Sequence, residues 1–133
     1  MRVDFYEMGG RYTDPLLVAG VLVGRAWPKS SPIAVTGSPA QLELLDERLW
    51  SEPNGRFLPH AIDDDTAPIR LSESPPDQAA VLINLDPTGP LPSGQYERIL
   101  EIVPPEESLK QKLRERWVAW KQTGAELHHH VLK

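Results

Sequence analysis

The segment IAVTGSPAQLELLDERLW, residues 33–50, decides the fold class. Its first three residues form an apolar run typical of a short buried strand, and the turn Thr36-Gly37-Ser38-Pro39 follows at once. The serine of this turn is a suitable N-cap, and the proline suits the first turn of a helix that we expect to end at about Trp50. The inner face of this helix carries apolar residues at helical spacing: Leu42, Leu45, Leu49 and Trp50.

The residues before this segment repeat the same order of elements. The stretch RVDFYEM, residues 2–8, predicts a first strand that Gly9-Gly10 ends. Asp14 and Pro15 then provide the N-cap and the first turn of a helix, dense in apolar residues, that we expect to reach Trp27. Strand, helix, strand and helix within about 50 residues are typical of an α/β domain with a parallel sheet.

Residues 51–78 interrupt this rhythm. They contain five prolines and the acidic run Asp63-Asp64-Asp65, and only residues 69–71 have the composition of a short strand. A connection of this length in a compact domain is usually either functional or disordered. We therefore treat this middle segment as a place to look for function.

The remaining segments complete the expected sheet. The nearly continuous apolar run AAVLINL, residues 79–85, predicts a strand buried on both faces, and RILEIV, residues 98–103, predicts another. A last helix is expected over residues 106–123, with Gly124 as its C-terminal stop. No internal repeat or clear boundary divides the chain, so we expect residues 1–133 to form a single α/β domain with a mostly parallel central sheet flanked by helices.

Composition excludes some classes of function. The chain has no cysteine, which excludes disulfides, zinc–thiolate sites and cysteine nucleophiles. Its 14 bases and 19 acids give a net charge of −5, so we expect no direct binding to nucleic acid as a partner. The N-terminus lacks the apolar run of a signal peptide, and no stretch reaches the ~18 apolar residues of a membrane span. We expect a cytoplasmic protein without a membrane partner.

The last helix contains the most informative pattern. At 100° per residue, Lys110, Arg114, Trp117 and Lys121 fall within a stripe about 60° wide. Such a row of bases with an aromatic at its edge would suit an acidic peptide with an apolar end, because the bases meet carboxylates and the indole meets the apolar side chain. The alternative is an ordinary solvated helix face whose bases complement the helix dipole. The neighbouring stripe is apolar and is expected to face the sheet: Leu109, Leu113 and Trp120.

A second group of large apolar residues lies around the end of the second helix. Trp50, Phe57, Leu58 and Pro59 precede His60 in the proline-rich segment. These side chains would suit an exposed patch for a protein partner. The alternative is that they cover the core beneath the loop, as satellite clusters commonly do.

Signals for a cofactor or an enzyme are weak. His60 with Asp63–Asp65 contains metal-ligand residue types without a fixed geometry, and His128–His130 is at most an incidental chelator. The loops at Gly37 and at Gly9-Gly10 each follow a strand, but neither matches a phosphate-binding motif, and both are better explained as turns and caps. We expect no cofactor and no metal; a small nucleotide- or metal-dependent α/β enzyme is the alternative.

Two segments together resemble the DNA polymerase III chi subunit family. LLDERLWSEPNGRFLPH, residues 44–60, is similar to the end of the family's second helix, with L-D-x-x-L-W, a short spacer and F-x-P-H. IVPPEESLKQKLRERWVAWK, residues 102–121, is similar to its last strand and helix. The resemblance implies a Rossmann-like α/β fold and a non-catalytic subunit. Proteins of this family bridge the clamp loader and the single-stranded-DNA-binding protein.

The resemblance also implies residues for each partner. The acidic, Phe-terminated tail of single-stranded-DNA-binding protein would meet Lys110, Arg114 and Trp117. The family often has a base directly after the helix aromatic, where this chain has Val118, and we hypothesise that Lys121 replaces that base. An assembly subunit that lacks the tail site is the alternative.

A separate surface would bind the small psi subunit. The resemblance places it on Trp50, Phe57 and Pro59. The resemblance implies this partner less directly than the tail, because psi is far less widespread than proteins similar to chi.

Overall fold

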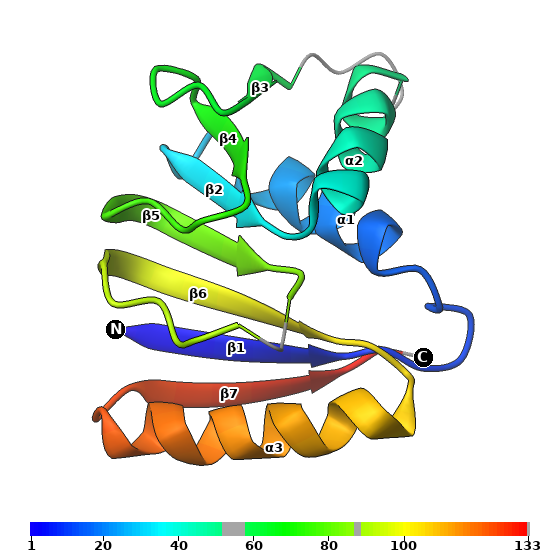
Figure 1. The fold of residues 1–133 in the computed structure, drawn as a ribbon, viewed down its shortest axis with the longest axis vertical. Coiled ribbons are helices and arrows are strands. Elements are labelled where there is room, and N and C mark those ends of the chain that lie inside the picture. Colours follow the sequence, from blue (N-terminus) through cyan, green and yellow to red (C-terminus); the bar gives the residue numbers. More distant parts are fainter. Residues whose placement is uncertain (52–57, 87–88, 133) are drawn as a thin grey trace.

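The computed structural model describes residues 1–51, 58–86 and 89–132 (Figure 1). Within these residues, seven strands form one sheet and three helices pack against it. The elements in chain order are β1 (Arg2–Glu7), α1 (Pro15–Ala26), β2 (Ile33–Thr36), α2 (Pro39–Ser51), β3 (His60–Ile62), β4 (Ile69–Ser72), β5 (Gln78–Asn84), β6 (Gln95–Val103), α3 (Glu107–Gln122) and β7 (Glu126–Val131).

The sheet has the strand order β3-β4-β2-β5-β6-β1-β7, and every neighbouring pair is parallel. The first strand, β1, lies between β6 and β7, so segments from both ends of the described chain are side by side (Figure 1). The expected Rossmann-like α/β fold with a mostly parallel central sheet is confirmed, and the sheet is parallel throughout.

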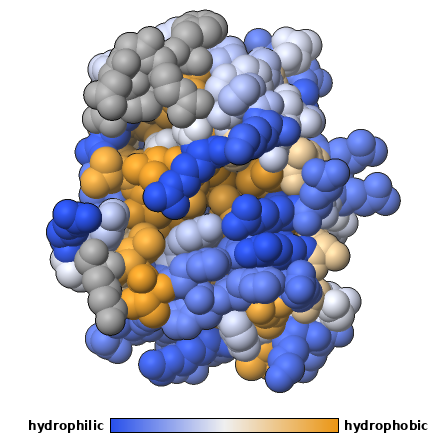
Figure 2. All heavy atoms as spheres, turned by 180° about the vertical axis from the view of Figure 1, so that it is seen from behind, coloured by the Kyte–Doolittle hydropathy of each residue, from blue (hydrophilic) through white to orange (hydrophobic). Residues whose placement is uncertain are grey.

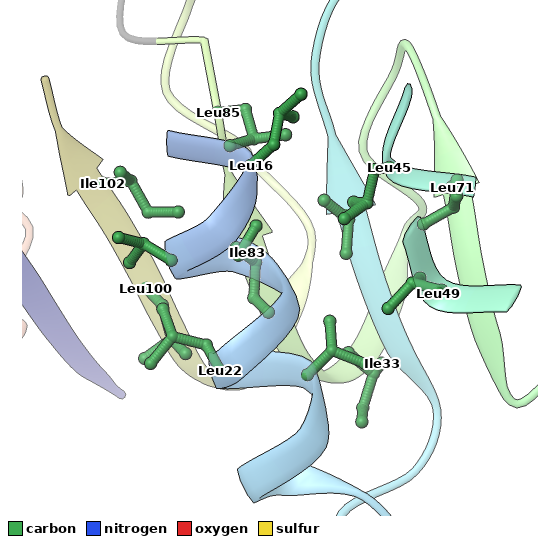
Figure 3. Packing of buried hydrophobic residues seen from close by; sticks show 14 of the residues in the cluster. Leu16, Leu22, Ile33, Leu45, Leu49, Leu71, Ile83, Leu85, Leu100 and Ile102 are labelled. Carbon is green, nitrogen blue, oxygen red and sulfur yellow. The ribbon is translucent and has the colours of Figure 1, made fainter. Parts of the chain in front are cut away.

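The helices cover opposite faces of the sheet. Successive side chains of a strand point to opposite faces, and Tyr6 of β1 belongs to the core under α1 and α2, whereas Phe5 belongs to the core under α3. The first core is aliphatic: leucines of α1 and α2 point toward Ile33, Ile83 and Leu100 of the strands (Figure 3). Seen from behind, the molecule has hydrophobic surface that is crossed and bordered by hydrophilic side chains (Figure 2).

The predicted helix starts are confirmed by their caps. The Asp14 carboxylate accepts a hydrogen bond from the backbone N–H of Leu16 at 2.9 Å, and Pro15 is the first helical residue of α1. At α2, the Ser38 N–H donates to the Gln41 side chain at 2.9 Å, and the Gln41 N–H donates to the Ser38 hydroxyl at 3.3 Å. This reciprocal pair is a capping box, which satisfies two backbone donors that have no partner within the helix.

Two strands were not predicted, and one begins earlier than expected. β7 contains the histidine run 128–130, which we interpreted as an incidental chelator; instead it pairs with β1, with His128 opposite Asp4. Its polar composition concealed it, because an edge strand has only one neighbour and need not be apolar. β3, at the other edge, is only three residues long. β6 begins at Gln95 rather than at residue 98.

Among the residues that the structure describes, no helix is both long enough and apolar enough to cross a membrane.

Candidate functional site

A pocket of about 390 Å³ lies between α3 and the carboxyl-terminal halves of β1, β6 and β7. Its volume falls within the usual range of small-ligand and side-chain pockets, roughly 300–1,000 Å³. Three elements of the sheet and one helix contribute side chains to it: Phe5, Glu7, Val103, Lys110, Leu113, Arg114, Trp117, Val118 and His129.

The inner wall of the pocket is apolar. Phe5, Val103 and Leu113 are almost completely buried, and all three belong to the core between α3 and the sheet. Trp117 is half-buried beside them, with its ring centroid 5.1 Å from that of Phe5 and the two planes tilted by 59°. The indole is therefore held by packing, and part of its surface still faces the pocket.

The outer wall on α3 is basic. Lys110 and Arg114 are four residues apart, so they lie one above the other on the same side of the helix. The Lys110 ammonium is 3.3 Å from the Glu107 carboxylate, in a surface pair that water and salt screen strongly. Within residues 1–51, 58–86 and 89–132, Arg114 has no carboxylate within 4.0 Å, so its guanidinium is available to an anionic ligand.

The structure brings together three of the four residues predicted to bind the tail. Lys110, Arg114 and Trp117 line the pocket, whereas Lys121 is not among its lining residues. Val118, which stands where the family often has a base, does line the pocket, and its side chain is exposed. The hypothesis that Lys121 replaces this base stays a prediction. Lys121 lies on α3 one helical turn after Trp117.

The sheet side of the pocket was missed by sequence reasoning. Glu7 follows Phe5 by two residues on β1, so both side chains face α3, and His129 is the β7 residue opposite Phe5. The His129 Nε2 atom is 3.2 Å from a carboxylate oxygen of Glu7, and its ring meets Trp117 edge-on at 6.4 Å. The alternation in β1 indicated the direction of Glu7, but His129 could be placed only once β7 was known to be a strand.

A buried polar network fixes α3 to the sheet. Arg116 and Glu101 are almost inaccessible to water, and two guanidinium nitrogens donate to the Glu101 carboxylate at 2.9 and 3.2 Å. The Asn84 amide donates to the same carboxylate at 2.9 Å, and the Trp120 indole donates to it at 3.3 Å. A third Arg116 nitrogen donates to the Gly89 carbonyl at 2.7 Å. These contacts set the rotation of α3 and hence the direction in which its basic side chains point.

The opposite face of β1 carries a second charged cluster, centred on Asp4. This fully buried carboxylate accepts hydrogen bonds from Arg98 at 2.7 Å and from Arg2 at 3.0 Å, and the Nε2 atom of His130 lies 2.8 Å from it. Burial raises the pKa of Asp4, but the hydrogen bonds from Arg98, Arg2 and His130 outweigh that effect and lower the pKa to about 2. The cluster therefore holds an ionised carboxylate inside the protein.

The surface predicted for the psi subunit is only partly described. Contrary to the prediction, Trp50 does not belong to the inner face of the second helix: it is 59% exposed at the end of α2, and its ring centroid is 4.4 Å from that of His60. Pro59 is half-buried, and Leu58 belongs to the core. Phe57 lies outside the described residues.

The residues considered for a metal or a phosphate have structural roles. His60 is buried, with its Nδ1 atom 2.6 Å from the Leu58 carbonyl and its Nε2 atom 3.2 Å from an Asp46 carboxylate oxygen. The described residues contain no group of three or more histidines and acids placed to hold a metal. At Gly37, an added Cβ would lie 2.9 Å from the Gln41 side chain and 3.2 Å from Leu85, so a larger residue there would crowd these two side chains.

The fold and the pocket together define a Rossmann-like α/β protein with a small-ligand or peptide-sized site at one edge of its sheet. A family model described as DNA polymerase III chi subunit, HolC, matches residues 1–128. The chain therefore belongs to the DNA polymerase III chi subunit family, as the two sequence segments predicted.

Individual relatives agree with this assignment. The DNA polymerase III subunit chi of Pseudomonas aeruginosa is 32% identical and aligns with 98% of this chain and 96% of its own length. The protein of the same name from Haemophilus influenzae is 29% identical over 75% of each chain. That of Escherichia coli K12 is 30% identical over 66% of this chain and 65% of its own. The first of these relatives covers nearly all of the chain, and the other two cover two thirds to three quarters of it.

Proposed function

We propose that this chain is a non-catalytic accessory subunit of DNA polymerase III that binds the acidic C-terminal tail of single-stranded-DNA-binding protein and links it to the clamp loader. The observation that supports this role is the pocket beneath α3, which combines an apolar inner wall with two bases at its mouth. A peptide that ends in phenylalanine and carries aspartates before it has the complementary arrangement.

The expected affinity of this interaction is modest. A hydrogen bond to a charged group contributes about 1.5–3 kcal/mol, and the pocket offers such contacts through Lys110 and Arg114. Ordering a flexible tail and these two long side chains offsets part of the gain. The binding should weaken as the salt concentration rises, but less steeply than a complex with DNA, which releases many counterions.

Titration calorimetry of the whole chain against an acidic peptide ending in Ile-Pro-Phe tests this proposal. Saturable binding is expected with this peptide and not with a scrambled peptide of the same composition. Arg114→Ala should lower the affinity by about tenfold or more, since it removes a charge-assisted contact. Lys112→Ala is the matched control, because Lys112 is an exposed base on the same helix outside the pocket. Equal losses in the two variants, or no binding by the unaltered chain, would contradict the proposal.

The same titration decides whether Lys121 replaces the missing base at Val118. Lys121→Ala should reduce affinity if its side chain reaches the ligand from the next helical turn. An unchanged affinity, beside a large loss in Arg114→Ala, would show that the pocket functions without a third base on α3.

A second partner surface is supported by the exposure of Trp50. We propose that Trp50 and Pro59, together with Phe57, bind the psi subunit or another clamp-loader component. An exposed tryptophan at the end of a helix is typical of residues that dominate the energy of a protein interface. Trp50→Ala should abolish co-purification with psi and leave tail binding intact, whereas Arg114→Ala should do the reverse. Loss of both interactions in either variant would contradict two separate surfaces.

A further inference from the structure

The pocket beneath α3 contains an acid as well as two bases. Glu7 lines it from β1, opposite Lys110 and Arg114 on α3. Its side chain is 33% exposed, so its charge is only partly screened by water. A ligand that brings a carboxylate into this pocket therefore approaches one like charge together with two opposite charges, and the like charge opposes binding.

Glu7 is paired with a histidine, His129, on the neighbouring strand β7. The His129 Nε2 atom is 3.2 Å from a Glu7 carboxylate oxygen, and half of the His129 side chain is exposed to water. Histidine is the side chain that ordinarily exchanges a proton between about pH 5 and pH 8, so an imidazole at this place can be neutral or positively charged. The charge of the Glu7–His129 pair is thus set by a single proton.

The other charged groups near the Glu7–His129 pair set the charge to which the proton on His129 is added. Lys110 and Arg114 face the pair from α3, and Glu107 is engaged with Lys110. With a neutral imidazole, the two bases and one acid that line the pocket give a formal charge of +1, and a protonated His129 raises it to +2. Protonation of His129 therefore strengthens the attraction of the pocket for an anionic peptide. This contribution comes from the sheet side of the pocket and not from α3.

We propose that Glu7 and His129 are further binding determinants of the pocket, and that they couple the capture of a carboxylate-bearing peptide to the uptake of a proton by His129. This inference rests on the proposed tail-binding function and states how the affinity for the tail depends on the charge of His129. With neutral His129, Glu7 opposes the ligand. With protonated His129, the Glu7 carboxylate is paired and the ligand meets a more positive pocket.

The test is calorimetry of the full chain with the acidic peptide ending in Ile-Pro-Phe at about pH 6 and about pH 8, where histidine changes its charge. The affinity should be about fivefold higher at the lower pH, the small end of the usual range for coupled sites because both side chains are partly exposed. Repeating the titration in two buffers of different ionisation enthalpy should reveal proton uptake on binding near neutral pH.

Two variants assign the effect to the pair. Glu7→Gln should bind at the higher pH about as tightly as the unaltered chain binds at the lower pH, because the pocket then carries a formal charge of +2 in both cases. His129→Gln should keep the weaker affinity at both pH values. His128→Gln is the matched control, because this histidine precedes His129 on the same strand but points to the opposite face of the sheet. Its pH dependence should equal that of the unaltered chain.

The outcomes separate this inference from the function on which it rests. Peptide binding with equal affinity at both pH values would overturn the role of the pair and leave the tail-binding function standing. The same holds if His129→Gln retains the full pH dependence. Failure of the unaltered chain to bind the peptide at either pH would overturn both.

Discussion

The two faces of the sheet are covered in different ways. Six of the 12 residues of α1 are buried, and five of these pack with leucines of α2 into an aliphatic core (Figure 3). Only three of the 16 residues of α3 are buried, and one of these is an arginine. The first layer uses its side chains to exclude water. The second is fixed by a few strong contacts, and most of its side chains are exposed or only partly buried.

This difference explains why the pocket lies beneath α3. A helix held by many interdigitating leucines has no room for a ligand beside the sheet. α3 is instead fixed by Leu113, Trp120 and the ion pair between Arg116 and Glu101, and the space next to Trp117 remains open. The comparison predicts that the two faces respond differently to substitution.

The largest expected effect is the loss of stability on breaking the ion pair between Arg116 and Glu101, which fixes α3. Arg116→Ala leaves the Glu101 carboxylate buried without its counter-charge, so the free energy of unfolding should fall by about 3–5 kcal/mol. Urea denaturation followed by circular dichroism measures this loss. The double substitution Arg116→Met with Glu101→Leu should recover most of it, because no charge is then buried. A loss below about 1 kcal/mol in the single variant would contradict the view that this pair fixes the helix.

On the other face, the response should come from packing alone. Leu45→Ala removes a fully buried side chain from the aliphatic core and should lower the free energy of unfolding by about 2–5 kcal/mol. Leu44→Ala, at the neighbouring exposed position, is the control and should change it by less than about 0.5 kcal/mol. Comparable losses from the two substitutions would break the contrast between the layers.

The charged cluster at Asp4 should respond to pH. The hydrogen bonds of its carboxylate hold the pKa at about 2 in the folded protein, below the ordinary value of 3.8. A pKa lowered by folding stabilises the protein above the unfolded value, and this contribution is lost as the pH falls from about 4 to about 2. Asp4→Asn should therefore reduce stability by about 2 kcal/mol at neutral pH.

The acid end of the titration gives the control for this prediction. The difference between Asp4→Asn and the unaltered chain should shrink toward zero as the pH approaches about 2. Glu43→Gln, on the exposed surface of α2, should follow the unaltered chain at every pH. A difference that stays constant from neutral pH to acid would exclude a role for the Asp4 charge.

The smallest expected effect is a gain in the affinity of the pocket for the acidic peptide. Val118→Lys places a third base on its rim and should raise the affinity for the acidic peptide by about 2- to 5-fold, the range of exposed charge pairs. Gln122→Lys adds the same charge on the same helix away from the pocket and should have little effect. An equal gain in both variants would indicate general attraction by charge rather than a contact at the site.

Local signals in the sequence were sufficient for most of the fold. Asp14 with Pro15, and Ser38 with Pro39, marked the starts of two helices because capping depends on residues close together in the chain. Gly124 ends α3 with a φ of +87°, a conformation that glycine adopts easily. β7 was missed since its polar residues carry no apolar alternation.

The site could be predicted only for the part carried by one helix. Spacing along α3 brought Lys110, Arg114 and Trp117 onto one side, and the structure places all three at the pocket. Glu7 and His129 are 122 residues apart in sequence, so their contact depends on strand order, which local patterns do not specify. Arg116 gave no local signal, because its burial follows from its ion pair with Glu101 on β6, a separate element.

The parallel pairing of β1 with β7 has a consequence for biosynthesis. One wall of the pocket is made by residues 5 and 7 and another by residue 129. Residues 5 and 7 leave the ribosome well before residue 129, so the pocket cannot close until β7 has been synthesised. A chain whose synthesis stops before β7 would carry the basic residues of α3 without a complete pocket.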